Sequence, residues 1–288
     1  MQVTMLSEVE PRSRRLAVGE FDGVHLGHRE VIAGADTVLT FDPHPLAVVR
    51  PGAAPKLLTS LEAKAELISE LGVRELVVIP FDKTFAAQSA AEFIDDVLVG
   101  RLQATHVAVG ENFRFGHGAE GDTRLLAADG RFVTKVVTLV ESDGEVVSSS
   151  HIRGLVLAGD VEQAGRLLGS PFSLRGEVVT GDQRGRTLGF PTANIVPDED
   201  LVCPGHGVYA ARAGGACAAV NVGVRPTFGT GRAVLVEAFL LDRDVDLYGQ
   251  LLRVDFLARL RGERRFESAE ALAAQMHQDV ELTRRLCG

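Results

Sequence analysis

The pattern of apolar segments changes near residue 170, and that change limits what this chain can fold into. Up to about residue 140, short apolar runs alternate with segments of helical periodicity. From residue 173 onward, apolar runs follow one another with only turns between them. The first pattern predicts a parallel sheet covered by helices on both faces, and the second predicts an antiparallel barrel or sandwich. With 288 residues the chain can hold two domains, which we place at 1–172 and 173–288.

The two domains differ in their predicted elements. In the first, the predicted strands are 16–18, 37–41, 75–79, 105–109 and 132–140. In the second, the predicted strands are 174–180, 192–196, 207–213, 216–224, 234–241 and 251–258, followed by a helix at 268–286. The fold class is therefore an α/β parallel-sheet domain followed by an antiparallel β-barrel domain with a C-terminal helix.

Capping-box spacing predicts two helix starts in the first domain. Thr59 stands three residues before Glu62, and Ser89 stands three residues before Glu92. The first of these helices is expected to end at Gly72, where glycine can adopt the left-handed conformation.

The charge balance restricts the partners of the chain. Lys and Arg total 30 against 39 Asp and Glu, a net charge of −9. We therefore expect no nucleic acid and no membrane among the partners. Any phosphate group that the protein binds must be held locally, by a few side chains and backbone N–H groups. The cysteines, Cys203, Cys217 and Cys287, lack metal-ligand spacing and indicate free thiols of a cytoplasmic protein. The sequence leaves the oligomeric state open.

The residues after the first strand can bind an anion. His25 and His28 stand where that strand turns into a helix, whose first backbone N–H groups point the same way. Asp22 and Gly23 belong to the same turn, and Gly27 lets a phosphate approach the backbone. Ligands of parallel sheets gather at the carboxyl ends of the strands. This placement favours a phosphate site over a surface turn with two solvated histidines.

Further polar groups are expected at the same edge of the sheet. Ser149, Ser150 and Arg153 open another helix, which suits a polyphosphate, although a Ser-rich start can also be a simple cap. Residues 40–45 follow the second strand, and Asn112 follows the fourth.

These motifs resemble a known family. Asp-Gly-Val-His-Leu-Gly-His (22–28) and Ser-Ser-Ser-His-Ile-Arg (148–153) resemble nucleotidyltransferases that move a nucleoside monophosphate. Phe-Asp-Pro-His-Pro (41–45) and Glu-Asn-Phe-Arg-Phe-Gly (111–116) narrow the resemblance to the adenylyltransferase half of bacterial bifunctional FAD synthetases. The resemblance implies a nucleotidyltransferase-type, Rossmann-like domain that transfers AMP from ATP to FMN.

The resemblance also implies roles for single residues. His25 and His28 would stabilise the ATP phosphates as the FMN phosphate attacks. The groups expected to bind the nucleotide and its β- and γ-phosphates are Asp22, Gly23, Gly27, Asn112, Ser149, Ser150 and Arg153. One departure is the eleven-residue interval between His28 and Thr40, where the family has a helix about two turns longer.

A glycine-rich segment of the second domain suits a phosphate. It contains Gly181, Gly185 and Gly189 with Arg186 and Thr187, and glycines let backbone N–H groups curl around phosphate oxygens. The alternative is a hairpin loop. Thr192 and Asn194 follow, two residues apart on a predicted strand, so they face the same side. Their oxygens suit a Mg²⁺ ion that bridges ATP phosphates.

Glu237 lies within the apolar run 234–241. A carboxylate among apolar residues of a strand costs free energy unless it is paired or used. It is therefore a candidate general base, with an edge-strand glutamate that points to water as the alternative.

These features resemble the riboflavin kinase family, together with the segments 207–209, 221–228 and 246–249. The resemblance implies that Glu237 activates the ribityl 5′-hydroxyl, that Thr192 and Asn194 hold Mg²⁺, and that the glycine-rich segment covers ATP. The segment 256–266, with Arg264 and Phe266, corresponds to the part that closes over the flavin.

The leading hypothesis is a bifunctional enzyme with the small-molecule substrates riboflavin, FMN and ATP. One alternative is a riboflavin kinase alone, with an altered first domain. The other is a flavin-binding regulatory protein without catalysis.

Overall fold

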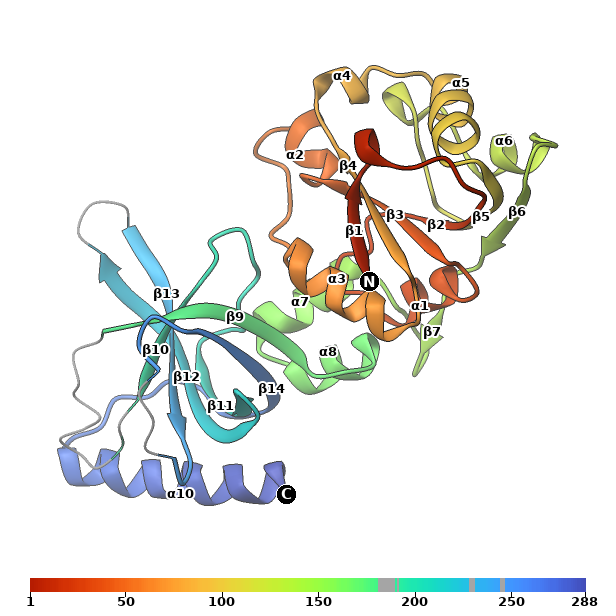
Figure 1. The fold of residues 1–288 in the computed structure, drawn as a ribbon. Coiled ribbons are helices and arrows are strands. Elements are labelled where there is room, and N and C mark those ends of the chain that lie inside the picture. Colours follow the sequence, from red (N-terminus) through yellow and green to blue (C-terminus); the bar gives the residue numbers. More distant parts are fainter. Residues whose placement is uncertain (181–189, 191, 228–230, 244–246) are drawn as a thin grey trace. The chain divides into compact units, whose positions relative to one another are not determined.

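The computed structural model describes residues 1–180, 190, 192–227, 231–243 and 247–288. Its contacts divide the chain into two units, Met1–Ser149 and Ser150–Gly288 (Figure 1). Helices α7 (Ser149–Ala158) and α8 (Val161–Leu168) lie between this division and the barrel. The domain boundary at 172/173 therefore stays a prediction.

The first unit is built on six strands that all pair in parallel, in the order β1-β4-β3-β2-β5-β6 (Figure 1). The strands are β1 (Gln2–Met5), β2 (Arg14–Val18), β3 (Thr37–Asp42), β4 (Glu75–Pro80), β5 (Ala104–Gly110) and β6 (Val133–Val137). The parallel sheet and the five predicted strands are confirmed. The prediction omitted β1, because this four-residue edge strand has a single buried residue, Thr4.

Both faces of the sheet are covered, as its continuous apolar strands require. On β3, Val38 packs in one buried cluster with Ile68 of α3, while Leu39 packs in the other with Leu98 of the π-helix η2. Neighbouring strand residues point to opposite faces, so the two clusters lie on opposite sides of the sheet. The helical and short elements are η1 (Leu6–Glu8), α1 (Leu26–Ile32), α2 (Pro45–Val49), α3 (Leu61–Glu70), α4 (Lys83–Ala86), α5 (Ala90–Glu92), η2 (Phe93–Arg101), η3 (His117–Ala119), α6 (Thr123–Ala128), β7 (Glu141–Ser142) and β8 (Glu145–Val146).

One of the two predicted capping boxes is confirmed and the other is wrong. Ser89 and Glu92 form a reciprocal box at α5. At α3 the N-cap is Ser60, whose Oγ accepts from Ala63 N at 3.2 Å. The hydroxyl of Thr59 is not available as a cap, because it faces Asp22 and Gly23 instead. The end of α3 is as predicted, since Gly72 has a φ of +82°.

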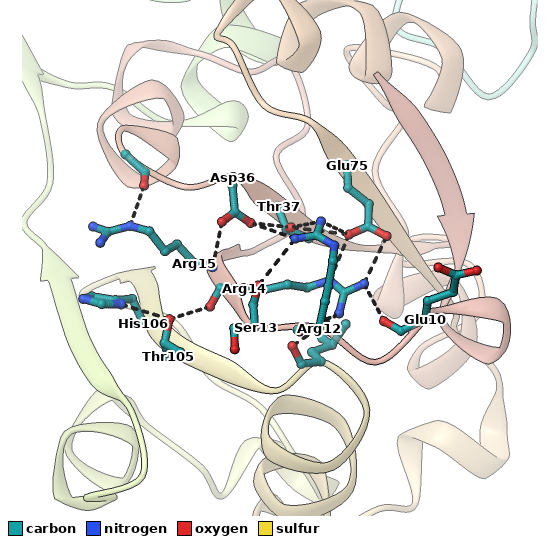
Figure 2. A network of polar contacts seen from close by, with 12 residues as sticks. Glu10, Arg12, Ser13, Arg14, Arg15, Asp36, Thr37, Glu75, Thr105 and His106 are labelled. Carbon is teal, nitrogen blue, oxygen red and sulfur yellow. Dashed lines mark hydrogen bonds and ion pairs between the residues drawn. The ribbon is translucent and has the colours of Figure 1, made fainter.

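An ionic network ties the amino ends of three strands together (Figure 2). Arg14 at the start of β2 is 1% exposed, and its Nε donates to Glu75 Oε2 at 2.8 Å. Arg12 reaches the same oxygen at 2.6 Å, and Thr37 joins from β3. Burial alone would raise the pKa of Glu75. The hydrogen bonds and charges of Arg14 and Arg12 outweigh it and hold the pKa below its ordinary value.

Replacing Glu75 by glutamine is expected to lower the free energy of unfolding by about 3–5 kcal/mol at pH 7, because it leaves Arg14 buried without a counter-ion. The folded pKa of Glu75 lies below the unfolded value of 4.5. The stabilisation is therefore full above pH 4.5 and disappears as the pH falls through the folded pKa. Urea unfolding at pH 7 and at pH 3 measures both effects.

The matched control for that prediction is Asp95→Asn. Asp95 pairs with Arg131 at 2.6 Å, but the two side chains are 57% and 49% exposed. This change is expected to cost less than about 1 kcal/mol. Equal losses for Glu75→Gln and Asp95→Asn would contradict the structural role of the buried pair.

The second unit contains a closed antiparallel barrel in the order β10-β13-β12-β11-β14-β9 (Figure 1). Its strands are β9 (Phe172–Val179), β10 (Ala193–Pro197), β11 (Gly207–Ala213), β12 (Ala216–Thr227), β13 (Gly231–Leu240) and β14 (Leu251–Arg261). The predicted strands and the barrel are confirmed. So is the C-terminal helix, α10 (Ala269–Cys287), in which Met276 and Val280 pack with Phe190 and Phe239.

Candidate active sites

The order of the strands in the first sheet reverses between β2 and β5. The chain runs outward from β2 through β3 to β4, and β5 then pairs with β2 on its other side. The strand order therefore reverses between β2 and β5, and ligands of open α/β sheets bind outside the carboxyl ends of strands at such a point. The loop with His25 follows β2, and Asn112 follows β5, where it is exposed.

The loop after β2 has an unusual backbone. Phe21, Gly23 and Val24 have φ values of +52°, +84° and +44°. Left-handed conformations are rare for residues with a side chain such as Phe21 and Val24, and they cluster at functional sites. The loop brings His25 to the N-cap of α1 and His28 to its first turn.

The two imidazoles stack on each other. Their ring centroids are 3.6 Å apart and the planes differ by 18°. His25 Nδ1 accepts from the backbone N–H of His28 at 3.3 Å, so a neutral His25 carries its proton on Nε2. His28 Nδ1 is buried and has no hydrogen-bond partner among the described residues.

Both histidines are uncharged at neutral pH. Burial lowers the pKa of His25 to about 4. Burial, followed by the charges of His25 and Lys64, lowers the pKa of His28 well below its ordinary value. The pair therefore presents neutral imidazoles rather than two positive charges.

Sequence reasoning missed two ionisable side chains of this site: Lys64, which acts on His28, and Glu20, which acts with Lys64. Lys64 on α3 is 5% exposed, and its Nζ donates to Thr40 Oγ1 at 3.4 Å. Thr40 donates in turn to the backbone oxygen of Glu20 at 3.1 Å. Burial raises the pKa of Glu20 to about 8, against the opposing charge of Lys64, and the charges of Asp22 and Asp42 add to the rise. The sequence signal for Lys64 is its spacing: it stands three residues after Leu61 and four before Ile68, on the buried face of α3.

Asp22 joins three segments around the loop. Its Oδ1 accepts from Leu58 N at 2.8 Å and from Thr59 N at 3.1 Å. Its backbone oxygen accepts from Ser149 Oγ at 2.9 Å. Gly23 N–H donates to Thr59 Oγ1 at 3.1 Å. These contacts position the loop, and contact of Asp22 or Gly23 with a nucleotide stays a prediction.

The remaining predicted residues of the first site are Gly27 on α1 and Ser150 and Arg153 on α7. A side chain at Gly27 would put its Cβ 3.2 Å from the His25 ring, so this glycine makes room for the imidazole. Ser150 and Arg153 lie on α7, where Arg153 Nη1 donates to Ser150 Oγ at 3.3 Å. The short interval after His28 contains the end of helix α1 (Leu26–Ile32) and the start of β3, and β2 and β3 still pair in parallel register.

In the barrel, three polar side chains lie in one row across neighbouring strands. Asn194 on β10 and Asn221 on β12 are the direct cross-strand partners of Glu237 on β13. Directly opposed residues of antiparallel strands point to the same face. Asn221 Nδ2 donates to Glu237 Oε2 at 3.2 Å. The edge-strand alternative for Glu237 is wrong, because β13 pairs with strands on both sides.

The row points away from the barrel interior. Val236 and Ala238, on either side of Glu237, are 1% and 0% exposed. Phe239, two residues further, packs with Met276 and Val280 of α10. Since alternate residues share a face, Glu237 lies on the outer wall, on the side that α10 covers.

Thr192 and Asn194 are the predicted metal ligands. Thr192 immediately precedes β10, and Asn194 is 5% exposed within it, next to Glu237 in the cross-strand register. Hydroxyl, amide and carboxylate oxygens are the donors that Mg²⁺ prefers, so the residues fit this ion. Gly181, Gly185, Arg186, Thr187 and Gly189 lie outside the described residues.

Arg264 and Phe266 follow β14 and lie against each other. The Arg264 guanidinium carbon is 4.8 Å from the Phe266 ring centroid, and that of Arg261 is 5.6 Å away. Arg264 also contacts Gln275, and Arg261 pairs with Asp279 at 2.8 Å, both on α10. The segment is thus fixed against the C-terminal helix, and its contact with flavin stays a prediction.

Two other features are absent from the described residues. In the part of the chain that the structure describes, no helix is long and apolar enough to cross a bilayer. Within the same residues, no three His, Cys, Asp or Glu side chains are grouped to hold a metal.

Two stacked histidines at the switch point of a parallel sheet, followed by a barrel with a carboxylate in its wall, are the arrangement expected of a two-domain transferase. Sequence models of known families agree: FAD synthetase matches residues 7–151 and riboflavin kinase matches residues 168–287. The chain belongs to the family of bifunctional riboflavin kinase/FMN adenylyltransferases.

Individual relatives align over nearly the whole chain. The bifunctional riboflavin kinase/FMN adenylyltransferase of Escherichia coli K12 is 40% identical, over 97% of this chain and 94% of its own. That of Listeria monocytogenes is 38% identical, over 93% and 91%. A crystal structure described as a macrolide-efflux protein from Streptococcus pneumoniae is 30% identical, covers 99% of both chains and has a TM-score of 0.90.

Proposed function

We propose that this chain makes both flavin nucleotides. The second domain transfers the γ-phosphoryl group of ATP to riboflavin, which gives FMN and ADP. The first domain transfers the adenylyl group of a second ATP to FMN, which gives FAD and pyrophosphate. The observation that carries this proposal is the match of both family models to one chain, FAD synthetase to residues 7–151 and riboflavin kinase to residues 168–287.

In the kinase reaction, Glu237 is the general base. Its carboxylate accepts the proton of the ribityl 5′-hydroxyl as that oxygen attacks the γ-phosphorus and the bond to the bridging β,γ-oxygen breaks. Thr192 and Asn194 would hold Mg²⁺, which neutralises phosphate charge when bound. By the family resemblance, Gly181, Gly185, Arg186, Thr187 and Gly189 would bind ATP, and Arg264 and Phe266 would contact the flavin.

In the adenylyl transfer, the protein positions two anions and stabilises charge. An oxygen of the FMN phosphate attacks the α-phosphorus of ATP, and the bond between the α-phosphorus and the bridging oxygen breaks. His25 and His28 donate neutral N–H groups to the phosphates. Ser149, Ser150 and Arg153 hold the leaving β- and γ-phosphates, and Asn112 lines the nucleotide site. Lys64 adds a buried positive charge beside the histidines.

The parallel register of β2 and β3 favours the bifunctional proposal over a kinase with an idle first domain. The short helix α1 keeps that register, with His25 at its N-cap. The interval that departs from the family length therefore leaves both histidines at the switch point.

Incubating the pure protein with riboflavin, ATP and Mg²⁺, and separating the flavins by chromatography, tests the proposal. We expect FMN to appear first and FAD afterwards, with pyrophosphate equal to FAD and no product when EDTA is added. Formation of FMN without FAD would support the alternative of a riboflavin kinase whose first domain is inactive. Formation of neither would leave a flavin-binding protein, to be tested by direct titration with riboflavin and FMN.

A further inference from the structure

Asn221 is a cross-strand neighbour of Glu237 without a predicted role of its own. The two residues face each other across the antiparallel pair of β12 and β13. Only the NH₂ group of Asn221 can donate to a carboxylate, and it lies 3.2 Å from Glu237 Oε2. The hydrogen bond therefore fixes which end of the amide faces the carboxylate.

The position of Asn221 in its strand is unfavourable unless its side chain is used. Asparagine is depleted in strands, and Asn221 stands between Val220 and Val222, which are both fully buried in the barrel. An aliphatic residue would suit this half-buried wall position better by propensity alone. The hydrogen bond to Glu237 is the interaction that an aliphatic residue could not make.

The contact restrains a side chain that otherwise has three rotatable bonds. A carboxylate in the barrel wall can take several rotamers, and a general base must hold one oxygen within about 3 Å of the proton that it accepts. The amide occupies Oε2, which leaves Oε1 for the substrate. A hydrogen bond to a charged acceptor is also stronger than one between neutral groups.

We propose that Asn221 is a positioning residue of the kinase, which holds the Glu237 carboxylate through Oε2 so that Oε1 receives the proton of the substrate hydroxyl. The inference depends on the proposed role of Glu237 as the base. Asn221 itself touches neither substrate nor the reacting atoms. The three residues of the row then have different roles. Asn194 would hold the metal of the nucleotide, Glu237 accepts the hydroxyl proton, and Asn221 orients the carboxylate of Glu237.

The proton balance of the step is unchanged by Asn221. The hydroxyl oxygen forms its bond to the γ-phosphorus, and the proton moves to Glu237 Oε1. ADP leaves with the electron pair of the broken bond. The amide of Asn221 keeps its own protons throughout and only holds the acceptor in place.

Asn221→Ala in the full-length enzyme tests the inference. We expect kcat for FMN formation to fall about 10- to 100-fold, with KM for riboflavin and for ATP within about twofold, because binding does not use this residue. Asn221→Ser keeps a hydroxyl donor and should recover part of kcat. FAD formation from supplied FMN, in the other domain, should stay unchanged and reports that the chain is folded.

A double-mutant cycle separates action through Glu237 from a general effect on the barrel. In a Glu237→Ala background, Asn221→Ala should change the residual rate less than about twofold, because no carboxylate remains to be positioned. An equal loss in both backgrounds would overturn the inference, as would an unchanged kcat or a rise in KM alone. If Asn221→Ala does not fold, Asn221→Ser against wild type and in the Glu237→Ala background gives the same comparison.

The same variants distinguish an error in the role of Glu237 as the base from an error in the role of Asn221 as its positioning residue. If Glu237→Ala itself keeps the wild-type rate, the role of Glu237 is wrong. If Glu237→Ala removes the activity but Asn221→Ala does not lower kcat, Glu237 remains the base and only the positioning role is lost.

Discussion

Glu237→Gln is expected to lower kcat for FMN formation by about 10²–10⁴-fold, the usual contribution of a positioned general base. Glutamine keeps the shape of the side chain and can still meet Asn221 across the strand pair, but it cannot accept the hydroxyl proton. The barrel wall should therefore be preserved, with KM for riboflavin and ATP little changed. FAD formation from supplied FMN should continue at the wild-type rate.

Glu177→Gln is the matched control for this prediction. Glu177 lies on β9 of the same barrel, pairs with Val196 and Leu251 across the ladders, and is exposed. The same chemical change there should leave both reactions within about twofold. Stopped assays with chromatographic separation of riboflavin, FMN and FAD measure the wild type and both variants. A loss of less than tenfold in Glu237→Gln, or an equal loss of FAD formation, would refute the role of Glu237.

Local sequence patterns predicted most of the fold because each strand carries its own signal. β3 and β4 are mostly apolar and buried along all but their last residue, and the barrel strands follow one another along the chain. β1 lacked such a signal, since only Thr4 is buried in it. β1 pairs with β4, about 70 residues later in the chain, and the four residues of β1 carry no local pattern that predicts this pairing.

The parts of the sites that were missed depend on contacts between distant segments. Thr59 has capping-box spacing, but Asp22, 37 residues earlier, accepts from its backbone N–H and leaves the cap to Ser60. Lys64 meets Thr40 only because α3 packs against the face of β3. Asn221 finds Glu237 through a cross-strand register that no periodicity specifies. The residue types were readable from the sequence, and their partners were not.

The charge state of the histidines also depends on tertiary structure. A pair of imidazoles at a helix start favours an anion from sequence alone. The stacked, buried arrangement with Lys64 nearby determines that both are neutral. Neutral imidazoles can still polarise a reacting centre as N–H donors, and they avoid bringing two like charges to 3.6 Å.

His28→Ala is expected to lower kcat/KM for FAD formation by about 10²–10³-fold, the usual cost of removing one preorganised donor to developing charge. FMN formation should stay within about twofold. The His25 ring loses its stacking partner in this variant. The loss of kcat/KM in the double variant His25→Ala/His28→Ala should therefore be smaller than the product of the two single losses, because each substitution partly removes the function of the other histidine.

His106→Ala is the control, since His106 lies near the amino end of β5 and contacts Thr105 (Figure 2). It should leave both reactions unchanged. The pH dependence of the rate tests the charge state of the histidines. The pKa of both site histidines lies below the ordinary 6.5. The rate of FAD formation by the wild type should therefore not change between pH 6 and 8 through the titration of an imidazole. A limb near pH 6.5 that disappears in His28→Ala would show that a charged imidazolium, rather than a neutral donor, acts on the phosphates.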